Sequence, residues 1–203
     1  MRCLLVVLGL TSACGNVTRQ IGDAPEGPHD APKAVDAILD APTCSTFIAA
    51  TSTATDVLTF TQSGGSFQSF GCAPIDPTYW MSGSGMSLTV TFVTAQSHPS
   101  LRVWGMNTDD TASIAVNGSA YSLDTSSASL APKVVCGLSP GPEGMAFVSG
   151  MLTGANTPAD GNYSYQDVTI NLSNVTSIQI SGQTGAGWGV AGASVPGCVA
   201  NPT

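Results

Sequence analysis

The sequence predicts an all-β domain, an antiparallel β-sandwich, and three observations support this fold class. Residues that favour helices are scarce: only 5 of the 203 residues are Lys or Arg, and charged residues make up 9% of the chain. An ordinary soluble domain has about 25%. Glycine (23 residues) and proline (13 residues) interrupt the chain at strand-like spacing. Apolar and polar residues alternate with the period of two that a half-buried strand requires. A jelly roll is favoured, with an immunoglobulin-like Greek key as the alternative.

The alternation of apolar and polar residues locates the strands. It is clearest between Met86 and Phe92, where every second side chain is apolar and the residues between are Ser or Thr. Such a segment buries one face and exposes the other to solvent. The other segments that favour strands are, in chain order, residues 47–50, 57–60, 101–104, 145–152, 168–172, 178–180 and 188–195.

The strongest local signal is the pair Asn117-Gly118. Both residue types tolerate the positive φ angles of a type I′ turn, whose twist matches that of an antiparallel hairpin. The residues on either side, 111–116 and 119–123, are suited to strands. The sequence therefore predicts a β-hairpin whose two strands meet at this pair.

Residues 1–14 predict an export signal. A positively charged Arg2 precedes a short apolar run at residues 4–10, and small residues then lead to Cys14. The run resembles the lipobox of bacterial lipoproteins, although Thr11 stands where such motifs usually have Leu. The resemblance implies a lipid anchor on Cys14 that binds a membrane, with the outer membrane or cell surface as location. Cleavage by an ordinary signal peptidase, with a periplasmic or secreted product, is the alternative.

Residues 15–43 predict a disordered linker, which joins the signal to a folded domain at residues 44–203. Asp-Ala recurs four times in the linker, three times followed by proline. The segment contains no aromatic residue and little apolar surface to offset the entropy of ordering. Acidic tracts of this kind resemble the tethers of surface lipoproteins in some Gram-negative bacteria.

Four cysteines lie within residues 44–203, and an even number in an exported domain predicts two disulfides. No Cys-x-x-Cys spacing or neighbouring histidine supports a metal site instead. Pairing of Cys44 with Cys72 and of Cys136 with Cys198 is favoured. Closure of the whole domain by a bond between Cys44 and Cys198 is the main alternative.

Charge and histidine content narrow the classes of function. The formal net charge of −8 argues against a nucleic-acid partner, because binding to nucleic acid needs a basic surface. A hydrolase is the least supported class: His98 is the single histidine of the folded domain and lies in a loop, and no nucleophile-elbow motif is present. Glu143 is the domain's single glutamate, and no spacing pairs it with a second carboxylate for glycosidase chemistry. We expect a protein that is not an enzyme.

The densest polar cluster is Asn107-Thr108-Asp109-Asp110, directly before the predicted hairpin. Its carboxylate and amide oxygens are hard ligands that suit calcium, whereas a plain turn capped by Asx side chains is the alternative. Together with the hairpin, the cluster resembles the corresponding hairpin of galactose-binding-like and PA14-like sandwiches. That resemblance implies a glycan ligand, with Asp109 and Asp110 as calcium or sugar ligands.

Aromatic side chains are the second feature that favours a glycan, because a flat ring stacks on the apolar face of a sugar. Trp104 lies on the polar side of its strand pattern, and Trp188 lies in a glycine-rich loop, so both are candidate ligand residues together with Asn107. We expect a carbohydrate-binding or adhesion domain. A structural or protein-interaction domain of the cell envelope, without a small ligand, is the alternative.

Overall fold

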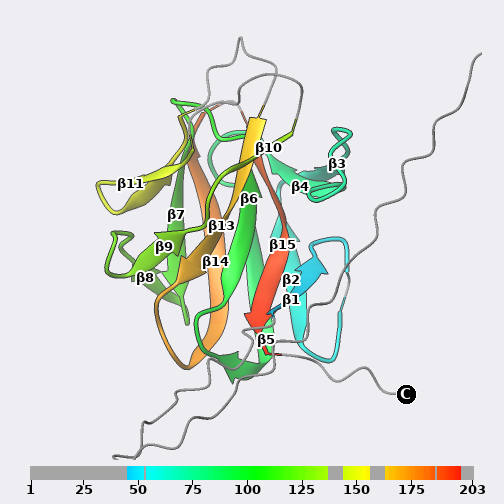
Figure 1. The fold of residues 1–203 in the computed structure, drawn as a ribbon, viewed down its shortest axis with the longest axis vertical. Coiled ribbons are helices and arrows are strands. Elements are labelled where there is room, and N and C mark those ends of the chain that lie inside the picture. Colours follow the sequence, from blue (N-terminus) through cyan, green and yellow to red (C-terminus); the bar gives the residue numbers. More distant parts are fainter. Residues whose placement is uncertain (1–44, 53, 137–143, 156–162, 186, 198–203) are drawn as a thin grey trace, which may run out of the picture. The chain divides into compact units, whose positions relative to one another are not determined.

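A computed structural model describes residues 45–52, 54–136, 144–155, 163–185 and 187–197. The predicted signal, its lipidated Cys14 and the linker lie outside these residues. The described residues all belong to one compact unit, Asp40–Thr203. They form two antiparallel sheets that pack against each other as a sandwich (Figure 1). This part of the chain contains no helix, and hence none that could cross a membrane.

The first sheet has eight strands, and all of its pairs are antiparallel. Six strands follow the order β10-β13-β6-β15-β4-β3, while β1 pairs with β15 and β9 pairs with β13. The strands are β1 (Ser45–Ala49), β3 (Ser66–Gln68), β4 (Thr78–Met81), β6 (Ser100–Trp104), β9 (Ala128–Leu130), β10 (Val134–Cys136), β13 (Tyr163–Ile170) and β15 (Trp188–Pro196).

The second sheet has seven strands and is also antiparallel throughout. Six strands follow the order β11-β12-β7-β14-β5-β2, and β8 pairs with β7. The strands are β2 (Leu58–Ser63), β5 (Ser87–Gln96), β7 (Thr111–Val116), β8 (Ser119–Tyr121), β11 (Ala146–Val148), β12 (Met151–Thr153) and β14 (Val175–Thr184).

The strand order is that of a jelly roll. From β4 to β7 and from β12 to β15 the chain passes from one sheet to the other at every step. The principal strands consequently pair as β4-β15-β6-β13 in the first sheet and β5-β14-β7-β12 in the second. This double-sheet arrangement is the one expected for two combined Greek keys. The predicted antiparallel sandwich and the jelly roll are both confirmed.

The core lies between the sheets, and the period-two pattern places it there. Leu88, Val90 and Phe92 of β5 are buried, whereas Thr91 between them is exposed on the outer face. One predicted strand was wrong: residues 145–152 form two strands, β11 and β12. The reason is local, because Ser149 and Gly150 adopt positive φ angles (51° and 81°) that turn the chain between them.

The predicted hairpin is confirmed. Asn117 and Gly118 have φ angles of 52° and 77°, and they join β7 to β8. The second strand ends at Tyr121, two residues earlier than predicted. The Asn117 side chain also ties the hairpin to β14, because its Oδ1 accepts hydrogen bonds from the backbone N–H of Thr176 and Ser177.

The disulfide joins Cys72 to Cys136, so the favoured pairing of Cys44 with Cys72 and of Cys136 with Cys198 was wrong. The Cα atoms of Cys72 and Cys136 are 5.8 Å apart, a separation at which two cysteines bond readily. Sequence spacing could not reveal this, because the bond links the segment before β4 to β10 at the edge of the same sheet. Cys44 and Cys198 lie outside the described residues. The bond indicates an extracellular or periplasmic location.

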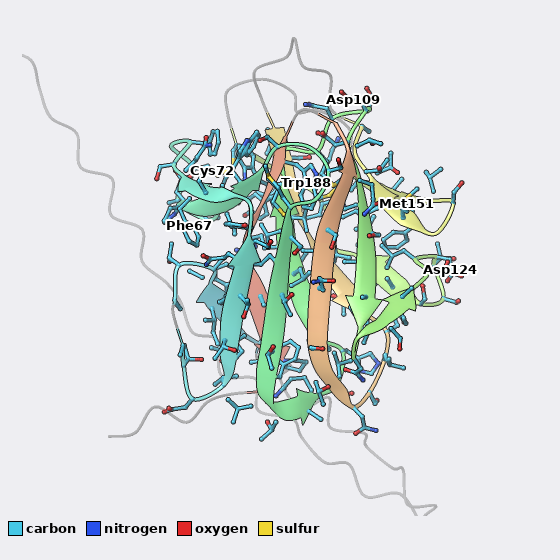
Figure 2. All side chains as sticks on the ribbon, turned by 180° about the vertical axis from the view of Figure 1, so that it is seen from behind. Phe67, Cys72, Asp109, Asp124, Met151 and Trp188 are labelled. Atoms are coloured by element: carbon cyan, nitrogen blue, oxygen red, sulfur yellow. A yellow bond between two sulfur atoms is a disulfide. The ribbon has the colours of Figure 1, made fainter. Side chains whose placement is uncertain are left out.

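Asp124 holds the turn between β8 and β9 (Figure 2). Its Oδ1 accepts hydrogen bonds from the Ser126 hydroxyl at 2.6 Å and from the backbone N–H groups of Ser126 and Ser127, both at 2.8 Å. These bonds favour the ionised carboxylate, with the Ser126 hydroxyl contributing most, and they lower the pKa of Asp124 from 3.8 to about 2.

We expect Asp124→Asn to lower the melting temperature at neutral pH and to have a much smaller effect near pH 2. Because the pKa of Asp124 is lower in the folded protein than in the unfolded chain, the ionised group stabilises the fold fully above about pH 4, and this contribution is lost as the pH falls through about 2. Thermal melts of both proteins across this range measure the difference. A difference that stays constant down to pH 2 would contradict the role given to Asp124.

Candidate ligand-binding groove

One row of side chains crosses the outer face of the first sheet. Cross-strand pairing aligns one residue from each of five neighbouring strands, and four of the five carry a hydroxyl group. Their sequence neighbours, such as Leu101 and Val168, are buried in the core, so the row faces away from the second sheet. From β1 to β9, this cross-strand row consists of Phe47, Ser194, Ser100, Thr169 and Ser129.

An ion pair lies beside the cross-strand row on the same face. Arg102 of β6 is paired with Asp167 of β13 in the sheet register, two residues along each strand from the row. The guanidinium donates two hydrogen bonds to the carboxylate, from Nε to Oδ1 at 2.8 Å and from Nη2 to Oδ2 at 2.9 Å. This two-bond geometry fixes both side chains.

The Arg102 guanidinium also contacts two aromatic rings. Its Cζ lies 4.5 Å from the ring centroid of Phe47 and 5.0 Å from that of Tyr165. The hydrogen bond to Asp167 raises the pKa of Arg102, although partial burial acts in the opposite direction. The ion pair sets one positive and one negative group side by side, so it adds no net charge to this face.

One end of this face is covered by residues 70–77. The ring of Phe70 packs against Trp80 and Trp104, with centroid separations of 5.1 and 4.4 Å. Arg102 Nη1 donates a hydrogen bond of 3.4 Å to the carbonyl of Pro74 in the covering segment. The cover therefore reaches as far as Arg102, and the face is open beyond it, toward Ser100.

The open part of the face forms a groove of about 590 Å³. Its floor consists of Ser194, Ser100, Thr169 and Asp167, which come from the three adjacent strands β15, β6 and β13. Ser45 of β1 and Ala131, directly after β9, lie at its two sides, and Ser97 and His98 line it from the loop between β5 and β6. Five of the nine lining residues carry a hydroxyl group, and Ala131 and Pro196 add apolar surface.

His98 lies in this groove, but not in a catalytic arrangement. Its Nδ1 is 2.9 Å from the hydroxyl oxygen of the adjacent Ser97, and both side chains are exposed. Asp167, the one carboxylate among the groove's lining residues, is bound by Arg102 and not by the His98 ring. Glu143 lies outside the described residues. That the protein is not an enzyme stays a prediction.

The two tryptophans predicted to contact a ligand are buried. Trp104 is 2% exposed, and its indole N–H donates a 3.0 Å hydrogen bond to the Thr78 hydroxyl. Trp188 is fully buried, and Figure 2 places it in the interior of the sandwich. The expectation of exposure was wrong for both: the cover of residues 70–77 closes over Trp104, and β15 begins at Trp188 and directs it into the core.

The polar cluster before the hairpin does not present its two carboxylates together. Asp109 is exposed at one end of the sandwich (Figure 2), whereas Asp110 is fully buried. Asp110 Oδ2 accepts a 2.6 Å hydrogen bond from the backbone N–H of Asn107, and its Oδ1 accepts a 3.4 Å bond from Gly187. Asp110 thus ties the turn that contains Asn107 to the loop before β15.

Calcium at this cluster stays a prediction. Asn107 is 7% exposed, and its buried Oδ1 has no hydrogen-bond partner among the described residues. Within the same residues there is no group of three or more His, Cys, Asp or Glu side chains that could hold a metal. A calcium ion here would therefore need carbonyl and water oxygens for most of its six to eight ligands.

Comparison with known proteins assigns no family to the chain. No family model matches the chain, and no curated protein matches it. A solved structure similar to it is the catalytic domain of a GH87 alpha-1,3-glucanase in complex with tetrasaccharides, at 15% sequence identity and a TM-score of 0.43. The match covers 78% of this chain but 29% of the other, and a likeness this distant assigns no activity. The fold and the disulfide define the class, a β-sandwich domain that functions outside the cytoplasm.

Proposed function

We propose that the sandwich is a carbohydrate-binding or adhesion module without enzymatic activity and that the groove on the first sheet is its ligand site. The observation that carries this proposal is the composition of the groove. Three of the four floor residues carry hydroxyl groups, which both donate and accept hydrogen bonds, and a fixed ion pair adds further polar contacts. Phe47 adjoins the groove and is 37% exposed, so the part of its ring that Arg102 does not cover is available to stack on a sugar.

The ligand site then lies on the outer face of the first sheet, whereas the sequence predicted it in the loop that contains Asp109. Trp104 and Trp188 then contribute to stability rather than to ligand contact. Asp167 holds Arg102 in place and needs no role as a base. A binding site requires only that Arg102 and Asp167 are held in place. Hydrogen bonds to sugar hydroxyls discriminate between ligands, and no covalent bond of the ligand needs to be broken.

We expect Phe47→Ala to weaken glycan binding about threefold to tenfold, because a lost ring contact costs about 0.5–1.5 kcal/mol. Thr169→Trp, which fills the floor of the groove, is expected to abolish binding. A glycan array identifies the ligand, and titration calorimetry then gives the dissociation constants.

Two control variants separate the site from general effects on the fold. Phe67 has the same exposure as Phe47 (38% against 37%) but lies on β3, outside the groove, so Phe67→Ala should bind normally. Thr91→Trp places the same new ring on the outer face of the second sheet and should also bind normally. Equal loss of binding in a groove variant and its control would exclude the groove as the site.

We also propose that lipid attached to Cys14 anchors the domain in the outer membrane, with residues 15–43 as its spacer. The support is the resemblance of residues 1–14 to a lipobox, together with the disulfide of the folded domain. Cys14→Ser is expected to move the protein from the membrane fraction to the soluble fraction of cells that express it. An unchanged distribution would show that Cys14 is not the anchor.

A further inference from the structure

We infer that the ligand of this groove is an uncharged polysaccharide, bound as an extended segment that lies across the strands. The inference rests on the proposed function and specifies the ligand class and its direction. Two independent features carry it: the orientation of the cross-strand row and the charge balance of the groove.

The direction follows from what bounds the groove. Along the strands, the covering segment meets Arg102 at one end through Pro74, and the loop with Ser97 and His98 lines the other end. Across the strands, the cross-strand row continues over all five strands from Phe47 to Ser129. Four interstrand spacings of about 4.8 Å make this row about 19 Å long, enough for several linked sugar rings but more than a single ring needs.

The cross-strand row also offers different contacts along its length. At the β1 end, the part of the Phe47 ring that Arg102 does not cover provides a stacking surface. In its middle and at the β9 end, Ser100, Thr169 and Ser129 provide hydroxyl groups. A ligand that satisfies the whole row must therefore combine an apolar ring face with hydroxyl groups repeated at regular intervals, which is the chemistry of a polysaccharide.

The charge balance of the groove argues against an acidic ligand. Arg102 is the single arginine of residues 44–203. Its Nε–Nη2 edge binds the Asp167 carboxylate, and its Nη1 donates a hydrogen bond to the carbonyl of Pro74. A sugar carboxylate bound here would lose water without gaining a free cation, and burial of an unpaired charge is costly. The chain also carries a formal net charge of −8, so acidic polymers are repelled at a distance.

The test is affinity electrophoresis and calorimetry of the folded protein at pH 8 and low salt. The probes are neutral polysaccharides (dextran, laminarin, mannan and galactan) and acidic ones (polygalacturonate and alginate). We expect at least one neutral polymer to bind at least tenfold more tightly than either acidic one. Oligosaccharides of that polymer should bind more tightly with increasing length until the cross-strand row is filled. Asp167→Asn, which frees the charge of Arg102, should gain affinity for the acidic polymers.

The possible results separate the inference from the proposed function. If an acidic polymer binds the wild type as tightly as any neutral one, and Thr169→Trp abolishes that binding, the groove binds glycans but the inference is wrong. If a monosaccharide binds as tightly as the longest oligosaccharide, the extended arrangement across the strands is wrong. If no polymer of either kind binds, or if Thr169→Trp binds like the wild type, the proposed function itself fails.

Discussion

Replacement of Trp104 by alanine is expected to lower the free energy of unfolding by about 3–5 kcal/mol, the range for loss of a large buried aromatic side chain. Trp104 is 2% exposed, and its ring lies 4.4 Å from Phe70 and 5.7 Å from Trp80, measured between centroids. The substitution also removes the hydrogen bond to Thr78. The residue that the sequence suggested as a ligand contact should therefore act on stability.

Chemical denaturation followed by circular dichroism measures this effect. Trp104→Phe retains a ring in the same place and loses the hydrogen bond, so it should cost clearly less than the alanine variant. The Phe variant should also bind a glycan normally, because Trp104 lies under the cover of residues 70–77 and outside the groove. A small stability loss combined with lost binding would instead identify Trp104 as an exposed ligand residue.

Removal of the disulfide by Cys72→Ala with Cys136→Ala is expected to destabilise the domain by about 4 kcal/mol. The two cysteines are separated by 64 residues, and closure of a loop of this length in the unfolded chain gives a value of that order. The bond also ties the segment that covers Trp104 to β10. We therefore expect earlier proteolysis within residues 70–77, ahead of global unfolding.

Denaturation curves and limited proteolysis of the double variant measure both effects, with Ser66→Ala on exposed β3 as a control for surface substitution. Peptide mapping under non-reducing conditions tests the pairing directly. Once Cys72 and Cys136 are joined, the one further bond possible among the four cysteines of residues 44–203 joins Cys44 to Cys198, which was the alternative pairing. Recovery of a peptide pair that joins Cys44 to Cys72 would contradict the structure.

Much of the fold follows from local sequence patterns. The alternation in β5 and the pair Asn117-Gly118 predicted a strand and a hairpin that the structure contains. Both signals are local, since one depends on the period of side chains along a strand and the other on the φ angles of two residues. The division of residues 145–152 was missed because its turn uses Ser149, which carries no strong preference for positive φ.

The groove could not be predicted in the same way. Its row joins Phe47 near the start of the domain to Ser194 near its end, and only the pairing of β1 with β15 brings them together. One signal was present in the sequence: Arg102, the domain's single arginine, alternates with the buried residues Leu101 and Val103. A single arginine on the outer side of a strand indicates a polar site on that face.

The sequence by itself determined the fold class, the longer strands and the hairpin, because side-chain alternation and turn preference depend on neighbouring residues. Only the tertiary structure decided the disulfide partners, the burial of Trp104 and Trp188, and the position of the groove. Each of these depends on which strands become neighbours when a jelly-roll chain passes from sheet to sheet. That pairing is set by packing of the whole core, and it places residues from distant parts of the chain side by side.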